Sequence, residues 1–552
     1  MEILAHVIFF AVLLLSFTAN FVHYMHMFQL NSYSAWEQGQ WMKKNVGNIF
    51  LRHLSAVLSA LYLLIFCAES YSYQPHEHVF EGGAEQIVHG ETVTRFGFMV
   101  FAVDLLICAG ILAVGLIFCK PKKAKKKLVF TPRVIRMCVT STIVYGAVCA
   151  LSFIFGYESG LYLSILCMWQ IFSLFMPMIA NFINKPIEKG VNNHYINDAK
   201  RIINELPNTT VIGITGSYGK TSTKFYLNKL LSAKYNVLMT PESYNTTMGV
   251  VKTIRGMLNA SHEIFICEMG AKGVGEIKEI CDIVNPKHSM ITSIGEQHLE
   301  TFKSVENIIK TKFEIVDCIT DGTVVLNYDN EFIRNHGTDK NKLTYGIGDG
   351  EYDYKAEDIK VSPKGTSFTL VHKGERYEFS TKLLGSHNVQ NIVGAIAMAH
   401  FMGVEFRDLV FPVKRLECVP HRMEILDKGN GVTVIDDAFN SNPAGARAAL
   451  STLRMMEDCE RILVTPGMVE LGEREYDLNR ELGEFAADCC DAAILVGERQ
   501  APPIKEGLLK KGYPEDRIYV VKSLNEGVKI AYGLNQGRKR VILLENDLPD
   551  NY

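Results

Sequence analysis

The sequence lacks the cysteine pattern of a metal-binding or disulfide-stapled protein. Its 13 cysteines include no C-x-x-C pair. Six lie in or beside long apolar runs: Cys67, Cys108, Cys119, Cys138, Cys149 and Cys167. This pattern supports neither a zinc ribbon nor a disulfide framework, and it fits a reducing compartment. A strong charge of either sign is also missing, because the net charge is −3, so nucleic acid is not expected as a partner.

The amino-terminal third of the chain has few charges and long apolar runs. Five stretches are long enough to cross a bilayer, which takes about 20 mostly apolar residues. They are residues 4–29, 49–68, 97–119, 136–156 and 160–182. A cleavable signal peptide is not expected, because no small-residue cleavage site follows the first run and four more runs come after it. The sequence therefore predicts a multi-pass transmembrane region with about five helices.

The charges of the connecting loops predict the orientation of this region. Residues 69–94 include glutamates and no Lys or Arg, whereas residues 120–136 hold six lysines and two arginines. Basic loops stay in the cytoplasm, which agrees with Lys43, Lys44 and Arg52 two crossings earlier. An odd number of crossings then places the chain after residue 184 in the cytoplasm, which is the compartment that contains ATP. A polybasic segment beside an apolar run typically meets anionic lipid, so membrane lipid is an expected partner.

A glycine-rich turn follows the apolar strand predicted at residues 211–214. Residues 215–222 read TGSYGKTS. Such glycines let backbone N–H groups approach phosphate oxygens, and the next helix adds partial positive charge. Lys220 is placed to neutralise the terminal phosphates and Thr221 to hold magnesium. Ile214 replaces the first glycine of the strict motif G-x-x-x-x-G-K-[ST], but the preceding strand favours a phosphate loop over an ordinary turn.

Helix and strand patterns alternate after the phosphate loop. Helices are predicted at residues 222–231, 248–258 and 304–319, and strands at residues 236–239, 263–269, 284–293 and 323–327. This alternation predicts a mostly parallel sheet with helices on its faces. Ligands of such sheets bind at the carboxyl ends of the strands. Glu268 and His298 follow two of these strands, and they are candidate magnesium ligands beside a triphosphate.

Lys312 lies on the apolar face of its predicted helix. It shares that face with Val305, Ile308, Ile309 and Val316 at i+3 and i+4 spacing. Taken alone, this pattern favours a lysine whose stem runs along the edge of the core while its amine stays in water.

Together these motifs resemble the Mur ligases of bacterial cell-wall synthesis. The phosphate loop, Glu268 with Met269, Gly270 and Ala271, His298 with Leu299 and Glu300, and the helix of Lys312 occur in the order of that family. Further similar segments follow at Asn327, Asp329 and Asn330, and at residues 385–391, 420–424, 436–443 and 466–472. The last two are most similar to the branch that adds D-alanyl-D-alanine. The resemblance covers about residues 205–535.

The resemblance implies a fold class and a domain organisation. An α-helical transmembrane region (residues 1–184) and a linker (185–206) would be followed by α/β structure. A P-loop central domain with a parallel sheet would occupy residues 207–415, and a Rossmann-like C-terminal domain residues 416–552.

The resemblance also implies roles for individual residues. Nucleotide would be bound by Gly216, Ser217, Gly219, Lys220, Thr221, Ser222, Asn391, Arg422, Asp437 and Asn440. Within this set, Asn391 would meet the adenine, Arg422 the terminal phosphate and Asp437 the ribose. Mg²⁺ would be held by Thr221, Glu268, His298 and Lys312, and the catalytic residues would be Lys220, Lys312 and His298. Such ligases carbamylate the lysine at the position of Lys312, which favours a metal-facing carboxylate over an amine in water.

The implied reaction is ATP-dependent amide-bond formation through an acyl phosphate, most like the addition of D-alanyl-D-alanine to a muramoyl tripeptide. One departure concerns the acceptor. About 20 residues separate the last apolar run from the phosphate loop, which leaves no room for the domain that grips uridine diphosphate in soluble members. The expected partners are an amine co-substrate and a small-molecule or lipid-linked peptide–sugar precursor. The expected location is the cell membrane, with the catalytic region in the cytoplasm.

Two other interpretations stay open, and two more are disfavoured. In the first, the chain is a membrane-anchored ligase of the same kind that acts on a different lipid-linked carboxylate acceptor. In the second, it is a non-catalytic membrane scaffold that binds ATP. Folylpolyglutamate-type synthesis shares the scaffold, but residues 437–443 favour the cell-wall branch. An ATP-driven transporter is disfavoured, because the sequence has no second nucleotide signature of the transporter kind. The oligomeric state, the acceptor and the added amine are not specified by the sequence.

Overall fold

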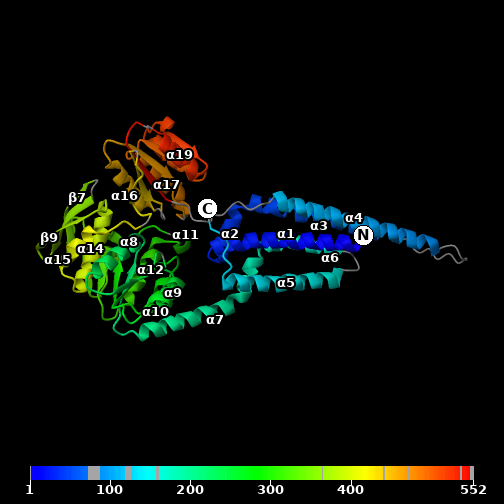
Figure 1. Cartoon of the computed structure of the whole chain (residues 1–552), viewed down its shortest axis with the longest axis horizontal. Coiled ribbons are helices and arrows are strands. Elements are labelled where there is room, and N and C mark those ends of the chain that lie inside the picture. Colours follow the sequence, from blue (N-terminus) through cyan, green and yellow to red (C-terminus); the bar gives the residue numbers. More distant parts are fainter. Residues whose placement is uncertain are drawn as a thin grey trace. The chain divides into compact units, whose positions relative to one another are not determined.

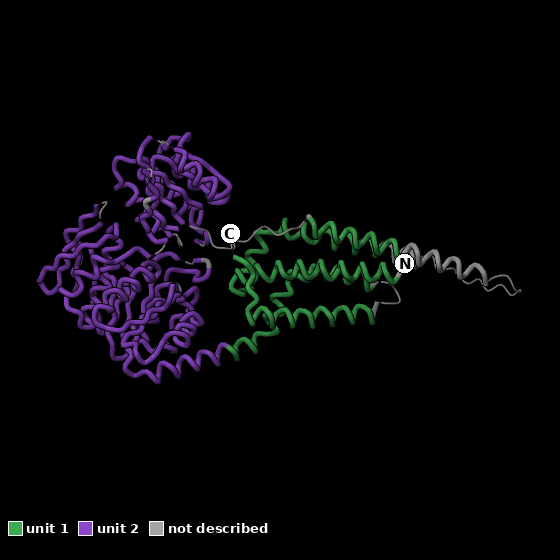
Figure 2. The backbone as a smooth tube through the Cα atoms, viewed as in Figure 1, with its two compact units in different colours: residues 1–191, 549–552 green, residues 192–548 purple. Residues whose placement is uncertain are grey.

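The structure, a computed structural model, describes most of the chain. The described residues are 2–72, 87–118, 126–156, 161–242, 244–297, 299–362, 365–419, 421–429, 431–438, 442–469, 471–534 and 537–546. The chain divides into two compact units, residues 1–191 with 549–552, and residues 192–548 (Figure 2).

The first unit is built from helices (Figure 1). These are α1 (Glu2–Leu30), α2 (Ala35–Lys44), α3 (Val46–Ser72), α4 (Ile87–Phe118), α5 (Pro132–Gly156), α6 (Leu161–Trp169), the 3-10 turn η1 (Gln170–Leu174) and α7 (Met176–Asn204). Within the described residues, three helices are long and apolar enough to cross a membrane: Ile3–Leu30, Val46–Ile65 and Pro132–Ile154. A fourth crossing results if α6 with η1 and α7, bent by 67° against each other, form one span. Length and composition thus support three or four of the five predicted crossings, and the membrane location stays a prediction.

The helix α7 occupies most of residues 185–206, which the sequence predicts as a linker. It contains Pro186 in its interior and continues to Asn204. The boundary between the two units falls inside this helix, after Val191.

The second unit begins with a nine-stranded sheet in the order β2-β3-β1-β4-β5-β6-β7-β8-β9. The strands are β1 (Thr210–Thr215), β2 (Val237–Met239), β3 (Ile264–Glu268), β4 (His288–Ile291), β5 (Val324–Asn327), β6 (Lys342–Gly346), β7 (Tyr354–Ser362), β8 (Gly365–His372) and β9 (Glu375–Thr381). Neighbouring strands are parallel from β2 to β7, and β8 and β9 extend the sheet antiparallel. The predicted parallel sheet is confirmed. The predicted strand at residues 284–293 is shorter than expected, because Val284 ends a helix and β4 starts at His288.

Helices cover both faces of this sheet. They are α8 (Lys220–Leu231), α9 (Thr247–Met257), α10 (Glu276–Val284), α11 (Leu299–Phe302), α12 (Val305–Asp317), α13 (Glu331–His336), α14 (Ser386–Phe401) and α15 (Phe406–Lys414). Successive side chains of a strand point to opposite faces: Ile266 packs with the α8 and α14 core, whereas Phe265 packs with the α9, α10 and α12 core. Because both faces are buried, ligand-binding residues are left to the ends of the strands.

A six-stranded sheet follows, in the order β10-β11-β15-β12-β13-β14. Its strands are β10 (Glu424–Asp427), β11 (Val432–Asp437), β12 (Glu460–Thr465), β13 (Ala492–Val496), β14 (Ile518–Val521) and β15 (Arg540–Glu545). All neighbours are parallel except β10 and β11. The helices are α16 (Pro443–Arg454), α17 (Glu475–Ala486), α18 (Ala501–Lys510) and α19 (Leu524–Gly533), with residues of α16, α17 and α18 in one core and of α19 in the other. Two α/β domains with parallel sheets agree with the predicted fold class.

Candidate nucleotide and metal site

The phosphate loop connects β1 to α8, and two of its glycines have backbone angles that other residues rarely adopt. Gly216 has φ +152° and Gly219 has φ +79°. A Cβ atom on Gly216 would lie 2.2 Å from Thr292 Oγ1, and one on Gly219 would lie 2.5 Å from Asn391 Oδ1. Only glycine fits at these two positions. Without side chains at these two positions, the backbone of this turn offers the kind of cradle that phosphate oxygens require.

Lys220 folds back over this loop. Its Nζ donates hydrogen bonds to the carbonyl oxygens of Gly216, at 2.7 Å, and Ser217, at 3.1 Å. Burial lowers the pKa of Lys220 to about 8; Glu268 opposes this shift and Arg422 adds to it. Most of the lysine is therefore still cationic at neutral pH, as contact with phosphate requires.

Glu268 is fully buried at the carboxyl end of β3. Its Oε1 accepts hydrogen bonds from Thr221 Oγ1 at 3.1 Å and from Asn245 Nδ2 at 3.0 Å, and its Oε2 lies 2.9 Å from Lys224 Nζ. Burial by itself would raise the pKa of Glu268, but Lys224 and Lys220 lower the pKa below its usual value. The carboxylate is therefore ionised.

The donors next to the phosphate loop fit Mg²⁺. The ion prefers hard oxygen ligands and is commonly held by one or two carboxylates together with substrate phosphates. The Thr221 hydroxyl and the ionised Glu268 carboxylate supply such oxygens side by side. His298, the third predicted ligand, lies outside the described residues.

Lys312 is 3 % exposed, so its amine does not lie free in water as the helix pattern alone would favour. Burial, with a further contribution from Lys220, lowers the pKa of Lys312 to about 7. Within the described residues, no hydrogen bond or ion pair reaches this amine. A buried lysine amine that is about half neutral at pH 7 and lies close to Lys220 and Glu268 is chemically suited to react with carbon dioxide.

The other predicted nucleotide ligands come from three further segments. Asn391, on α14, lies beside Gly219. Arg422 interacts electrostatically with both Lys220 and Glu268: its charge helps to lower the pKa of Lys220, and Glu268 opposes the lowering by burial of the pKa of Arg422 itself. Asp437, at the end of β11, accepts a hydrogen bond from the Met423 backbone at 3.1 Å, and burial raises its pKa to about 6.

Of the three remaining predicted nucleotide ligands, two serines lie in the described part of the chain and one asparagine does not. Ser217 and Ser222 are buried, and the Ser217 hydroxyl donates to the Gly295 carbonyl oxygen at 3.1 Å. This bond ties the phosphate loop to the segment after β4. Asn440 lies outside the described residues. Around the phosphate loop the structure thus brings together residues that are far apart in the sequence, and their individual roles stay predictions.

Two residues of the site were not found from the sequence. Lys224 is fully buried on α8, and besides its ion pair with Glu268 it donates to the Glu242 carbonyl oxygen. The sequence signal was available, because Lys224 precedes the buried Tyr226 and Leu227 on the same helix, much as Lys312 lies on the apolar face of its own. Asn245 follows β2 in a loop, where no periodic pattern distinguishes it.

Replacing Lys224 with methionine is expected to destabilise the central domain. The Glu268 carboxylate would stay buried without its main counter-ion, and breaking a buried ion pair from one side costs about 3–5 kcal/mol. Hydrogen exchange of the β3 amides measures this loss as a lower free energy of opening. The matched control is Lys229→Met, because Lys229 is exposed on the same helix. The double variant Lys224→Met with Glu268→Gln is expected to recover more than half of the lost free energy of opening. Equal losses of this free energy in Lys224→Met and Lys229→Met would contradict the prediction.

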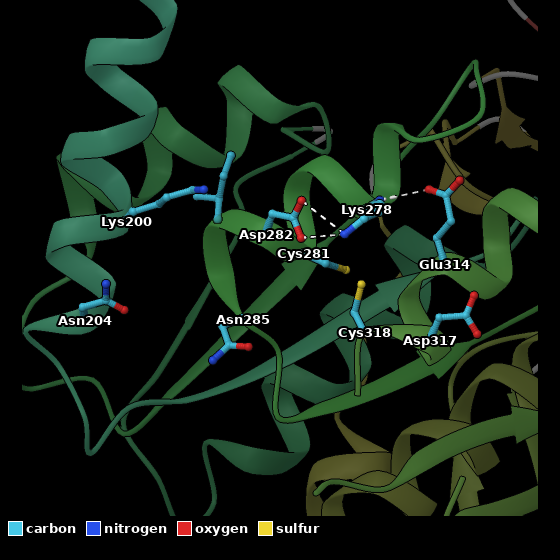
Figure 3. Close-up of a pocket in the computed structure, with 10 residues that line it drawn as sticks. Lys200, Asn204, Lys278, Cys281, Asp282, Asn285, Glu314, Asp317 and Cys318 are labelled. Atoms are coloured by element: carbon cyan, nitrogen blue, oxygen red, sulfur yellow. Dashed lines mark hydrogen bonds and ion pairs between the residues drawn. The ribbon is translucent and has the colours of Figure 1, made fainter. Parts of the chain in front are cut away.

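A hollow of about 700 Å³ lies elsewhere on the second unit, between α7, α10 and α12 (Figure 3). Three of its charged groups are engaged: Lys278 Nζ lies 3.0 Å from an Asp282 oxygen, and Glu314 accepts hydrogen bonds from the backbone of Gly275 and Lys278. None of the predicted site residues lines this hollow, so it is not the nucleotide site.

Residues 214–399 match the Mur ligase middle domain, and residues 421–545 match the domain described as Mur ligase, glutamate ligase domain. The UDP-N-acetylmuramoyl-tripeptide–D-alanyl-D-alanine ligase of Bacillus subtilis is 34 % identical over 323 residues, which are 58 % of this chain and 69 % of that protein. The enzyme of the same name from Escherichia coli is 26 % identical over 58 % of this chain and 73 % of its own length.

Solved structures of enzymes named MurF are also similar to this chain. MurF from Acinetobacter baumannii superposes with a TM-score of 0.59 and 26 % identity, over 64 % of this chain and 77 % of that chain. The MurF ligase of Thermotoga maritima, solved in complex with ADP, has a TM-score of 0.58 and 26 % identity, over 64 % of this chain and 80 % of its own. Both matched domains lie in the second unit.

Proposed function

Because the chain belongs to the Mur ligase family of ATP-dependent carbon–nitrogen ligases, we propose that it joins D-alanyl-D-alanine to the peptide carboxyl group of a muramoyl precursor. The observation that carries the proposal is the arrangement around the phosphate loop. A glycine cradle, the Lys220 cation and the Thr221–Glu268 oxygen pair lie together. Relatives that share this part of the chain are named for that reaction.

The chemistry proceeds in two steps. The acceptor carboxylate attacks the terminal phosphorus of ATP, the bond to the bridging oxygen breaks, and ADP leaves. The amine of the dipeptide then attacks the acyl phosphate carbon, loses a proton and expels inorganic phosphate, which leaves an amide bond.

Residues of this chain have distinct tasks in these steps. Lys220 exchanges its contacts with the loop carbonyls for phosphate oxygens and stabilises the charge that develops on them. Arg422, from the C-terminal domain, adds a second cation at the same place. A magnesium ion, when bound, supplies Lewis-acid stabilisation of the phosphate oxygens, and Thr221, Glu268, His298 and Lys312 are the residues that would hold it.

We also propose that the enzyme is a multi-pass protein of the cell membrane, with its catalytic unit in the cytoplasm and a lipid-linked acceptor. Three to four helices of sufficient length and apolarity support the membrane part. The basic residues Lys43 and Lys44 at the end of α2 support its orientation. A lipid-linked acceptor gives the helical region a purpose beyond anchoring.

A ligation assay tests both proposals. The full chain in lipid nanodiscs receives ATP, D-alanyl-D-alanine and either a soluble uridine-diphosphate-linked tripeptide or its lipid-linked form. We expect one ADP and one phosphate per amide formed, and a kcat/KM at least about tenfold higher for the lipid-linked acceptor. Equal kcat/KM values for the two acceptors would contradict the lipid-linked assignment. ATP binding without acceptor-dependent phosphate release would favour the non-catalytic scaffold.

A further inference from the structure

The first unit contains a polar cluster between α1 and α3 that the proposed ligation chemistry does not use. We call Asn20, His23, Tyr24, Arg52 and His53 the Arg52 cluster. Arg52 Nη1 donates to Asn20 Oδ1 at 3.2 Å, and the Tyr24 hydroxyl lies 2.9 Å from His53 Nε2. The cluster is internal to the bundle, because Asn20 is 5 % exposed, Tyr24 0 % and His53 4 %.

Aromatic rings enclose this cluster. Tyr24 and His53 stack with centroids 5.7 Å apart, and Trp41 of α2 meets the rings of His23 and Tyr24 edge-on at 6.1 and 6.3 Å. The residues of α1 and α3 therefore face one another beside Trp41 of α2, and the Arg52 side chain is partly buried.

Among the residues that the structure describes, no carboxylate pairs with the positive charge of the cluster. A guanidinium group offers five N–H donors, and within the described residues the neutral oxygen of Asn20 is the hydrogen-bond partner of Arg52. Two carboxylates of the unit are engaged elsewhere: Asp104 accepts from Tyr62, and Glu188 pairs with Arg136. His53 Nδ1 is buried without a hydrogen-bond partner, so the cluster has unused hydrogen-bonding capacity at two positions.

Arg52 lies inside an apolar span, where an ionised side chain needs a favourable partner. Arg52 is the seventh residue of the apolar span Val46–Ile65, which places its Cα about 9 Å along the helix from the start of the span. An ionisable side chain inside a span is costly, and it marks a functional site by default. A guanidinium group can form bidentate hydrogen bonds with two oxygens of a phosphate group.

We propose that the Arg52 cluster binds a phosphate group that is attached to a lipid. The phosphate would accept from the free N–H groups of Arg52 and from His53, and the lipid chain would lie along the apolar surface of the helices. The inference rests on the proposed function, since a lipid-linked sugar acceptor has a phosphate at the junction of sugar and lipid. It assigns the first unit to recognition of that junction, in addition to anchoring.

Binding of a polyprenyl phosphate to the full chain tests this inference without ATP or acceptor. The protein is placed in nanodiscs of neutral phosphatidylcholine, and binding is followed by phosphorus NMR. We expect saturable binding that Arg52→Gln weakens at least about tenfold and that Arg52→Lys retains in part. Lys43→Gln is the matched control, because it removes one exposed positive charge from the neighbouring helix α2.

Competition identifies the source of the phosphate. Phosphatidylglycerol and inorganic phosphate are each expected to compete at least about tenfold more weakly than the polyprenyl phosphate. Equal competition by either one, or equal weakening by Arg52→Gln and Lys43→Gln, would overturn the inference. If Arg52→Gln does not fold, His53→Gln provides the second test, because glutamine keeps a polar group at this position. We expect it to weaken binding at least about threefold. Unchanged binding by His53→Gln would count against the inference.

The test separates failure of the inference from failure of the proposed function. Ligation of a lipid-linked acceptor by a protein that binds no polyprenyl phosphate would leave the ligase intact and refute the Arg52 cluster as a site. Polyprenyl phosphate binding without ligation of any acceptor would refute the ligase function and leave the site intact.

Discussion

Lys220→Ala is expected to lower kcat/KM for ATP-dependent ligation by about 10²–10³, the loss typical for removal of one preorganised group that stabilises developing charge. The Lys220 ammonium group lies within the phosphate loop and contacts two of its carbonyl oxygens. Alanine leaves the loop without a cation where the terminal phosphates bind. The rate of ADP release in the presence of acceptor and dipeptide measures the effect.

Lys229→Ala is the control for this substitution. Lys229 lies on the same helix and is exposed, so this variant is expected to keep the wild-type rate. Melting temperatures of both variants separate lost catalysis from lost folding. Full ligation by a folded Lys220→Ala protein would refute the nucleotide site, and with it the proposed reaction.

Lys312→Ala is expected to lower the ligation rate by about 10²–10³, because it removes one group that would help to stabilise the charge of the transition state. The expected state of Lys312 is a carbamate: the neutral amine attacks carbon dioxide, an N–C bond forms and the amine loses a proton. Since burial lowers the pKa of Lys312 to about 7, the amine is mostly protonated at pH 6 and mostly neutral at pH 8. Ligation by protein freed of carbon dioxide is therefore expected to recover faster after bicarbonate addition at pH 8 than at pH 6.

Carbon NMR with ¹³C-labelled bicarbonate checks the modification directly. A carbamate signal is expected in the wild type and in Lys310→Ala, and not in Lys312→Ala. Lys310 is a suitable control because it is exposed on the same helix. A wild-type protein with no signal and no dependence on bicarbonate would show that Lys312 acts as an unmodified amine.

The sequence and the structure agree best where a pattern is local. The strand before the phosphate loop, the helix after it and the parallel order of the central strands were all predicted, because buried strands and amphipathic helices have their own periodicities. The family was predicted from ordered motifs, and the domain matches confirm it. The crossings of the first unit were predicted from apolar runs, of which three or four meet the length and composition of a span.

The site itself depended on contacts between distant segments. Glu268 and Lys224 are 44 positions apart, and no period in the sequence links them, yet their side chains form a buried ion pair. The environment of Lys312 was likewise decided by packing: its helix pattern alone favoured an amine in water, and in the folded chain the residue is 3 % exposed. Burial and neighbouring charge arise only when several elements meet, so they follow from the assembled domain.

The amino-acid order was sufficient for the apolar runs, the glycine turn, the alternation of elements and the family, because each of these is encoded over short stretches of chain. Tertiary structure alone revealed the counter-ion of Glu268, the low pKa of Lys312 and the hydrogen bond of Arg52 to the neutral side chain of Asn20. These properties depend on the distance between side chains and on the exclusion of water around them, and both quantities exist only after the chain has folded.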